Sequence, residues 1–143
     1  MIFVTGPTQS GKTTFAKTIA SRTGTKFFST GEFFREKNTE QVSESEQRSI
    51  TITDRSESLE EEIREKILEK AFSGHPYVVE GFPRSVEQVS FLDENVIHEF
   101  TIFYLDIGLD EALRRAKLRD RTDDDIEFVE KRWWAAYYQK QSI

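Results

Sequence analysis

Residues 2–14 read IFVTGPTQSGKTT, a short apolar run followed by a glycine-rich stretch that ends in lysine and threonine. This is the G-x-x-x-x-G-K-[ST] pattern, placed where a buried strand should give way to a helix. Its glycines let the backbone wrap closely, so that successive N–H groups point at phosphate oxygens. The helix that follows offers its positive N-terminal end to the same anion. The stretch therefore predicts a nucleoside triphosphate site, and a glycine turn with an incidental lysine is the weaker alternative.

Within this stretch, the residues expected to hold ATP share one loop and the first turn of the helix. They are Gly6, Pro7, Thr8, Gln9, Ser10, Gly11, Lys12, Thr13 and Thr14. Lys12 supplies a cation for the β- and γ-phosphates, and the Thr13 hydroxyl is the expected ligand of Mg²⁺. The loop by itself predicts a phosphoryl donor and says nothing of an acceptor.

The composition limits the remaining classes of function. A chain of 143 residues is the length of one domain, and its net charge of −6 argues against an extended nucleic-acid surface. The chain has no cysteine, which excludes disulfides and cysteine-ligated zinc. No apolar run approaches the length of a membrane span, and Met1 leads directly into the first expected strand. We therefore expect a cytoplasmic protein without a nucleic-acid or membrane partner.

Apolar patterning predicts strands that alternate with helices. The expected strands are 1–5, 26–28, 77–80 and 100–105, and the expected helices are 12–22, 29–35, 60–72, 85–92, 109–118 and 124–139. Because most of the strands are continuously apolar, they predict a parallel sheet covered on both faces. Residues 38–58 carry few apolar side chains, so we expect a mobile, partly helical segment there. One α/β domain follows.

Arginines gather at the ends of the expected elements. They stand at positions 35, 84, 115, 119, 121 and 132, several of them beside a glycine or a polar break. Phosphoryl transfer depends on aligning two anions and neutralising their charge, which requires several fixed cations. Arginine suits that task because its guanidinium is always charged and binds phosphate at two points. The alternative is that these arginines are solvated surface charges.

Three stretches resemble the adenylate kinase family of nucleoside monophosphate kinases. They are Thr30-Gly31-Glu32 with Arg35, Glu80-Gly81-Phe82-Pro83-Arg84 with Gln88, and Arg121-Thr122-Asp123-Asp124 with Arg132. The stretches occur in the family's order and span nearly the whole chain, and Gly-Phe-Pro-Arg is the most specific of them. The resemblance implies a P-loop three-layer α/β/α fold with a parallel sheet of about four strands in the order 2-3-1-4.

The resemblance also implies roles for individual residues. Arg115 and Arg119 would bind ATP together with the loop. The acceptor monophosphate would contact Thr30, Gly31, Arg35, Gly81, Phe82, Arg84, Gln88, Arg121 and Arg132. Catalysis would rest on Lys12, Arg84, Arg119, Arg121 and Arg132. Glu80 stands where the family has an aspartate that holds Mg²⁺ through water, and Asp123 and Asp124 would brace the neighbouring arginines.

The chain departs from the family in three ways: the lid is nearly absent, the family's fifth strand is missing, and the acceptor-binding insertion is polar and shortened. We expect a single domain over 1–143, with 30–73 as an acceptor-binding insertion and 119–123 as a vestigial lid. The family continues to a fifth strand, so the strand at 100–105 would be an exposed sheet edge here. The final helix could fold over that edge, a second copy could pair with it, or the chain could be a shortened one. We expect a monomer, with an edge-paired homodimer as the alternative.

The expected activity is Mg²⁺-dependent phosphoryl transfer from ATP to a nucleoside monophosphate. Ser85 and Gln88 follow the adenylate-type pattern, which favours AMP or dAMP as the acceptor. One alternative is a small-molecule P-loop kinase whose acceptor is a hydroxyl group. Another is a nucleotide-binding module with degraded catalysis, because fold alone does not fix function.

Two further features carry less information about function. His75 and His98 are isolated and predict no metal site. The aromatic residues of the final helix form i,i+4 pairs, Trp133 with Tyr137 and Trp134 with Tyr138, and core packing is the default interpretation of at least one pair.

Overall fold

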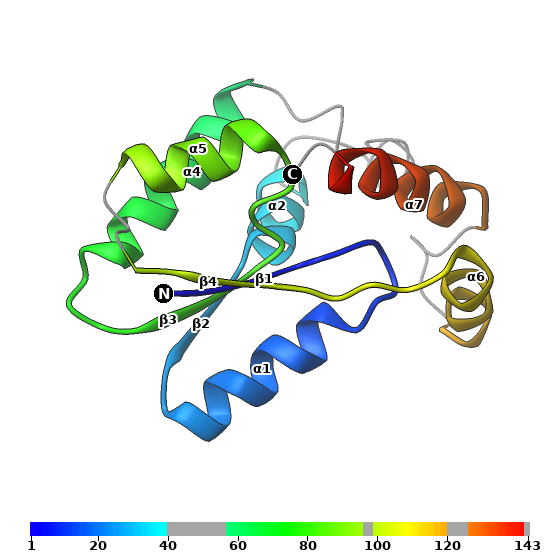
Figure 1. Cartoon of the computed structure of the whole chain (residues 1–143), viewed down its shortest axis with the longest axis horizontal. Coiled ribbons are helices and arrows are strands. Elements are labelled where there is room, and N and C mark those ends of the chain that lie inside the picture. The colour runs from blue at the N-terminus through cyan, green and yellow to red at the C-terminus, as the bar shows by residue number, and fades with distance from the viewer. Residues whose placement is uncertain (40–56, 96–98, 120–125, 142–143) are drawn as a thin grey trace.

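A computed structural model describes residues 1–39, 57–95, 99–119 and 126–141. Strands and helices alternate through most of the described residues, where two helices lie between β2 and β3 and two more follow β4 (Figure 1). In chain order the elements are β1 (Ile2–Thr5), α1 (Lys12–Thr23), β2 (Lys26–Ser29), α2 (Thr30–Thr39), α4 (Glu57–Ala71), β3 (Tyr77–Glu80), α5 (Val86–Glu94), β4 (Thr101–Tyr104), α6 (Leu109–Leu118) and α7 (Ile126–Lys140). Most of the expected segment 38–58 falls in residues 40–56, outside the described residues.

The four strands form one parallel sheet in the order β2-β3-β1-β4, which confirms the predicted topology. Val4 on β1 lies opposite Glu80 on β3 and Phe103 on β4. The carboxyl ends of β1, β3 and β4 therefore meet at one edge of the sheet. In parallel α/β sheets, ligands bind outside that edge.

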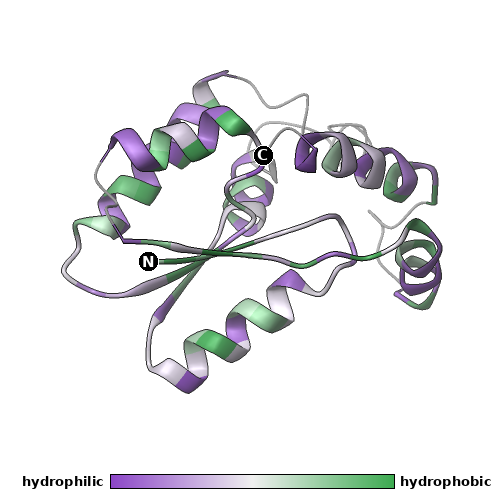
Figure 2. Ribbon diagram, in the orientation of Figure 1, coloured by the Kyte–Doolittle hydropathy of each residue, from purple (hydrophilic) through white to green (hydrophobic). Residues whose placement is uncertain are grey.

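Helices cover the sheet on both sides, so the fold is the predicted three-layer α/β/α arrangement. Figure 1 shows α1 below the sheet, α2, α4 and α5 above it, and α6 and α7 beyond the end of β4. One buried cluster comprises Phe3, Ile63, Ile67, Val79, Phe82 and Leu92, and the other comprises Val4, Ala16, Ala20 and Val78. Figure 2 shows apolar residues along the central strands and mixed helices around them.

Helix boundaries lie within two residues of the expected ones, except that α4 begins three residues earlier and α2 ends four residues later. α1 ends before Gly24, which adopts the left-handed conformation and donates its N–H to the Ala20 carbonyl. Ile63 and Ile67 are buried, as the apolar stripe of α4 predicts. Phe72 is the exception: it was expected beside that stripe but is 63% exposed. The prediction for Phe72 was wrong: its N–H still donates to the Leu68 carbonyl at 3.0 Å, but its side chain lies mostly in solvent at the end of the helix.

β4 is an edge strand whose side chains alternate between exposed and half-buried. The exposed Phe103 packs edge-on against Phe15 of α1 at 5.5 Å. Helix α7 contacts the residues that follow β4: Trp133 Nε1 donates to the Ile107 carbonyl at 2.8 Å, and Lys140 pairs with Asp106. Among the described residues no strand pairs with the outer edge of β4.

The aromatic side chains of α7 stack on one another. Trp133 and Tyr137 have ring centroids 5.3 Å apart, and Trp134 and Tyr138 have centroids 5.9 Å apart. Trp133 is half-buried, whereas Trp134 and Tyr138 are exposed, so core packing explains one pair only in part.

In the described part of the chain, no helix has the length and apolarity that crossing a membrane requires.

Candidate active site

The glycine-rich loop joins β1 to α1 at the carboxyl edge of the sheet, where the sequence predicted it. Gly6 has a φ of 140°, and a Cβ there would collide with the Leu105 carbonyl oxygen. Gly11 precedes α1 with a φ of 85°. Gly6 is therefore required because a Cβ has no room there, and Gly11 is favoured because its left-handed φ strains any other residue.

Lys12 lies over the loop, with its Nζ donating to the Pro7 carbonyl at 2.5 Å and lying 3.5 Å from Ser10 Oγ. The pKa of Lys12 is lowered to about 8, chiefly because burial disfavours the charged form. The positive charges of Arg84 and Arg119 lower this pKa further, while the Glu80 carboxylate partly opposes them. Two arginines and a carboxylate from other elements therefore lie within electrostatic range of the loop lysine.

Arg84 is positioned by the break that follows β3. Its Nε donates to the Gly81 carbonyl at 2.6 Å, and the Thr30 hydroxyl donates to the same oxygen at 3.0 Å. The Gly81 N–H in turn donates to the Val4 carbonyl at 2.8 Å, which ties this break to β1. Gly81 thus brings together two residues, Thr30 and Arg84, that were predicted to bind the acceptor monophosphate.

Gln88 is buried, and its side chain links α5 to α4. Its Oε1 accepts from the Arg84 backbone N–H at 2.6 Å, and its Nε2 donates to Glu60 Oε1 at 2.6 Å. Sequence reasoning missed Glu60, because no local pattern indicates a hydrogen bond between residues 28 positions apart. Glu60 therefore adds a carboxylate to the predicted acceptor side.

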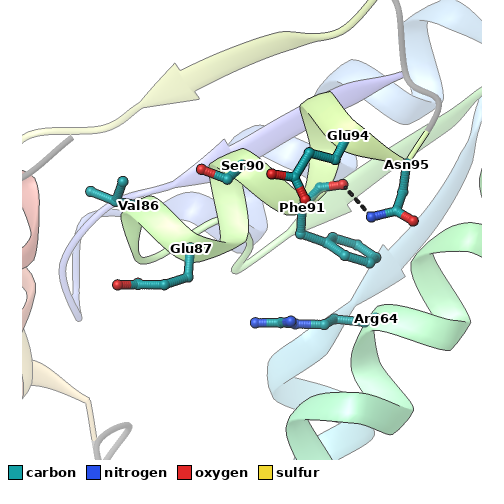
Figure 3. Close-up of a pocket in the computed structure, with 7 residues that line it drawn as sticks. All are labelled: Arg64, Val86, Glu87, Ser90, Phe91, Glu94 and Asn95. Atoms are coloured by element: carbon teal, nitrogen blue, oxygen red, sulfur yellow. Dashed lines mark hydrogen bonds between the residues drawn. The ribbon is translucent and has the colours of Figure 1, made fainter.

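A pocket of about 350 Å³ between α4 and α5 adjoins this pair. Glu60 Oε1 lies 3.6 Å from Arg64 Nε, and the Arg64 guanidinium lies 5.3 Å from the centre of the Phe91 ring. Figure 3 shows Arg64 reaching from α4 beneath that ring, with Glu87 and Ser90 of α5 lining the same hollow. The Glu60 carboxylate thus lies between Gln88 and Arg64, and of these two residues it is Arg64 that lines the pocket.

Two arginines of α6 reach back to the loop, and both bind Gln9. Arg115 Nη1 donates to the Gln9 carbonyl at 3.1 Å, and Arg119 Nη1 donates to Gln9 Oε1 at 3.2 Å. Arg115 is also held by Glu111, whose pKa is lowered to about 2 by hydrogen bonds from Arg114 and Arg115. Arg115 and Arg119, predicted at the donor, thus contact the donor loop.

Glu80 and Thr13 are the predicted magnesium ligands. Glu80 is buried at the end of β3, where its Oε2 accepts from Ser29 Oγ at 2.5 Å, and Thr13 lies in the first turn of α1. Mg²⁺ prefers oxygen donors and is usually bound by one or two carboxylates together with substrate phosphates. A buried carboxylate and a hydroxyl beside a phosphate-binding loop fit that requirement. Among the described residues there is no group of three or more histidines, cysteines or acidic residues that could hold a metal ion by itself.

The other predicted residues are less closely gathered. Arg35 is exposed, and its Nη1 lies 3.5 Å from the position that a Cβ on Gly31 would occupy. Phe82 is fully buried and packs against Phe3 in the core, and Arg132 is half-buried on α7. Arg121, Asp123, Asp124 and all but Arg119 of the predicted lid lie outside the described residues.

The sheet order and the loop after β1 define a P-loop nucleotide-binding domain. A family model described as an AAA domain (AAA_17) matches residues 5–130, and the chain belongs to that family. Adenylate kinase isoenzyme 1 from Rattus norvegicus is 28% identical over 152 aligned residues, covering 100% of this chain and 78% of the relative. Adenylate kinase from Mycobacterium ulcerans is 28% identical over 136 residues, covering 90% of this chain and 75% of the relative.

A solved structure supports the fold. An unliganded sugar kinase from Janibacter sp. HTCC2649 superposes with a TM-score of 0.72 over 94% of this chain and 76% of its own, at 20% identity. The resemblance to the adenylate kinase family is confirmed at modest identity over most of the chain. The protein is therefore an adenylate-kinase-like P-loop phosphotransferase.

Proposed function

We propose that the protein is a nucleoside monophosphate kinase that transfers the γ-phosphoryl group of ATP to a nucleoside monophosphate in a Mg²⁺-dependent reaction. The observation that carries the proposal is the electrostatic group at the loop: Lys12 with Arg84, Arg119 and Glu80 around it. These side chains come from three separate segments of the chain: the start of α1, the end of β3 with the break after it, and the end of α6. A triphosphate-binding loop alone does not need an arginine from the end of β3, whereas a second phosphate facing the first does.

In the proposed reaction, an acceptor phosphate oxygen forms a bond to the γ-phosphorus of ATP as the bond to the β,γ-bridging oxygen breaks. The products are ADP and a nucleoside diphosphate. Lys12 and Arg119 neutralise charge on the donor phosphates, and Arg84 holds the acceptor phosphate in line with them. Bound Mg²⁺ would neutralise further phosphate charge, and Glu80 and Thr13 would hold it.

The acceptor is proposed to lie on the side of α2, α4 and α5. Thr30 and Arg84 share the Gly81 carbonyl there, and Gln88 is fixed by Glu60. Arg35, Arg121 and Arg132 complete the proposed acceptor set. AMP and dAMP are the first acceptors to test, because Ser85 and Gln88 follow the adenylate-type pattern.

The test is a coupled assay of ADP formation with ATP, Mg²⁺ and each nucleoside monophosphate in turn. Turnover that is lost in Lys12→Ala and retained in Arg114→Ala supports the proposal, because Arg114 is an exposed α6 arginine paired with Glu111. Absence of turnover on every monophosphate overturns it. Hydroxyl acceptors are then assayed for the small-molecule kinase, and calorimetry that finds ATP binding without turnover identifies a binding module.

We also propose that the protein acts as a cytoplasmic monomer.

A further inference from the structure

Gln9 is the unusual residue of the loop. Its φ is 62°, which makes it the one non-glycine residue at positive φ in the described part of the chain. A residue with a Cβ pays a steric penalty in this left-handed region, where glycine does not. Gln9 is nevertheless only 8% exposed, so its side chain points into the protein. Strained backbone at a binding loop suggests that the side chain has a task there.

The contacts of Gln9 identify that task. Its side-chain Oε1 accepts from Arg119 and its backbone carbonyl accepts from Arg115, so one residue holds two arginines from one face of α6. Arg119 is the C-cap residue just after α6, and its backbone has left the helical conformation, with φ −100° and ψ 112°. Arg115 has Glu111 as a second anchor. Arg119 therefore depends more on Gln9 than Arg115 does.

We propose that Gln9 is a positioning residue that orients the Arg119 guanidinium toward the donor phosphates. The hydrogen bond uses one N–H of Arg119 and leaves the other donors of the planar guanidinium available for phosphate oxygens. Orientation before binding reduces the conformational entropy that Arg119 loses when ATP arrives. This inference rests on the proposed function only in placing Arg119 at the donor, and it does not depend on the acceptor.

The test is a double-mutant cycle on ATP affinity, measured by calorimetry on the full chain with Mg²⁺ and no acceptor. Gln9→Gly removes the side chain, suits the backbone and keeps the carbonyl that binds Arg115. It should weaken ATP binding about tenfold, the effect expected of one hydrogen bond to a charged group. In an Arg119→Ala background the same change should alter affinity less than twofold. A tenfold loss in both backgrounds, or no loss in either, overturns the proposal.

A stability measurement separates positioning from a purely structural role. Gln9→Gly should raise the midpoint of thermal unfolding, since it relieves the left-handed strain, whereas loss of a structural contact would lower it. Gln9→Asn is the matched control, because asparagine tolerates this backbone but its amide is one methylene short of Arg119. It should weaken ATP binding as Gln9→Gly does, and wild-type affinity in Gln9→Asn counts against the proposal.

The two proposals fail in different ways. Coupling between Gln9 and Arg119 in ATP affinity, together with no turnover on any monophosphate, supports the role of Gln9 and overturns the proposed kinase. Turnover on a monophosphate without coupling between Gln9 and Arg119 supports the proposed kinase and overturns the role of Gln9. Absence of ATP binding by the wild-type protein overturns both.

Discussion

The Arg84 guanidinium is fixed by the residue three positions before it, since Arg84 Nε donates to the Gly81 carbonyl at 2.6 Å. The same glycine leaves room for the rest of the guanidinium. A Cβ on Gly81 would lie 2.8 Å from Arg84 Nη2 and 2.6 Å from Thr30 Oγ1, and the φ of Gly81 is 86°. The absence of a side chain at position 81 therefore determines where Arg84 lies.

Gly81→Ala should reduce kcat/KM about 10²-fold, the effect typical of losing one electrostatic stabiliser of the transition state. The added methyl group must displace Arg84 and Thr30, which the proposed mechanism places at the acceptor. The measurement is steady-state kinetics with the acceptor varied at saturating ATP. ATP affinity should change little, because Gly81 is not part of the donor loop.

The matched control is Gly74→Ala. Gly74 also has a positive φ, of 72°, but a Cβ there would meet nothing within 4 Å. Both substitutions should cost about 1–2 kcal/mol of folding stability for left-handed backbone, and only Gly81→Ala should lose activity. Equal activity in the two variants would show that Arg84 does not act where the mechanism places it.

The lowered pKa of Lys12, about 8, predicts that ATP affinity depends on pH. Binding needs protonated Lys12, so affinity should fall as pH rises from about 7 to 9. Because phosphate charge stabilises the protonated form, binding near pH 8 should take up protons. Calorimetry in buffers of different ionisation enthalpy measures that uptake. Lys12→Ala should bind weakly and lose the dependence, and a persisting pH profile in this variant would assign it to another group.

The same pKa has a consequence for stability. The folded-state pKa of Lys12 lies below the usual value of 10.5, so the unfolded chain binds more protons between about pH 8 and 10.5. The contribution of Lys12 to the free energy of unfolding should therefore increase with pH across that window. Comparing the pH dependence of urea unfolding in wild type and Lys12→Met isolates this contribution.

Much of the fold could be predicted from sequence because its signals are local. Strands buried on both faces are apolar runs such as Val78-Val79, and the glycines of the loop mark its two turns. Arg84 was predicted from its place in a specific motif. These features depend on neighbours in the chain, which is the information that a single sequence carries.

The contacts that orient the site could not be predicted in the same way. Gln88 meets Glu60, and Arg119 meets Gln9, only because helices α4 and α6 pack as they do. The loop pattern leaves position 9 free, so it does not indicate a left-handed glutamine. Exposure of Phe72 could not be predicted either, because the spacing of apolar residues does not show whether another element packs over the last turn of a helix.

Glu80→Gln should raise the Mg²⁺ concentration needed for half-maximal activity, because the charge is removed while the hydrogen bond from Ser29 can persist. We expect a shift of about tenfold or more, in proportion to the loss of a charge-assisted contact. Mg²⁺ titration at fixed ATP measures it. Ser29→Ala is the control, since it removes the hydrogen bond and keeps the carboxylate, and its shift should be smaller. An unchanged magnesium requirement in Glu80→Gln would remove Glu80 from the proposed metal ligands.

Glu60 should affect the acceptor and not the donor. Its Oε1 accepts from Gln88 Nε2, so Glu60→Ala removes one of the two hydrogen bonds that hold the Gln88 amide and should raise the acceptor KM about tenfold, the effect of one hydrogen bond to a charged group. Glu60→Gln retains an acceptor oxygen and should recover part of that loss. Glu61→Ala, at an exposed neighbouring position on α4, is the control and should match wild type. Kinetics across the monophosphate panel decide the point: a loss that is equal for every base shows a general effect on α4, whereas a loss confined to one base shows that Glu60 and Gln88 set the specificity.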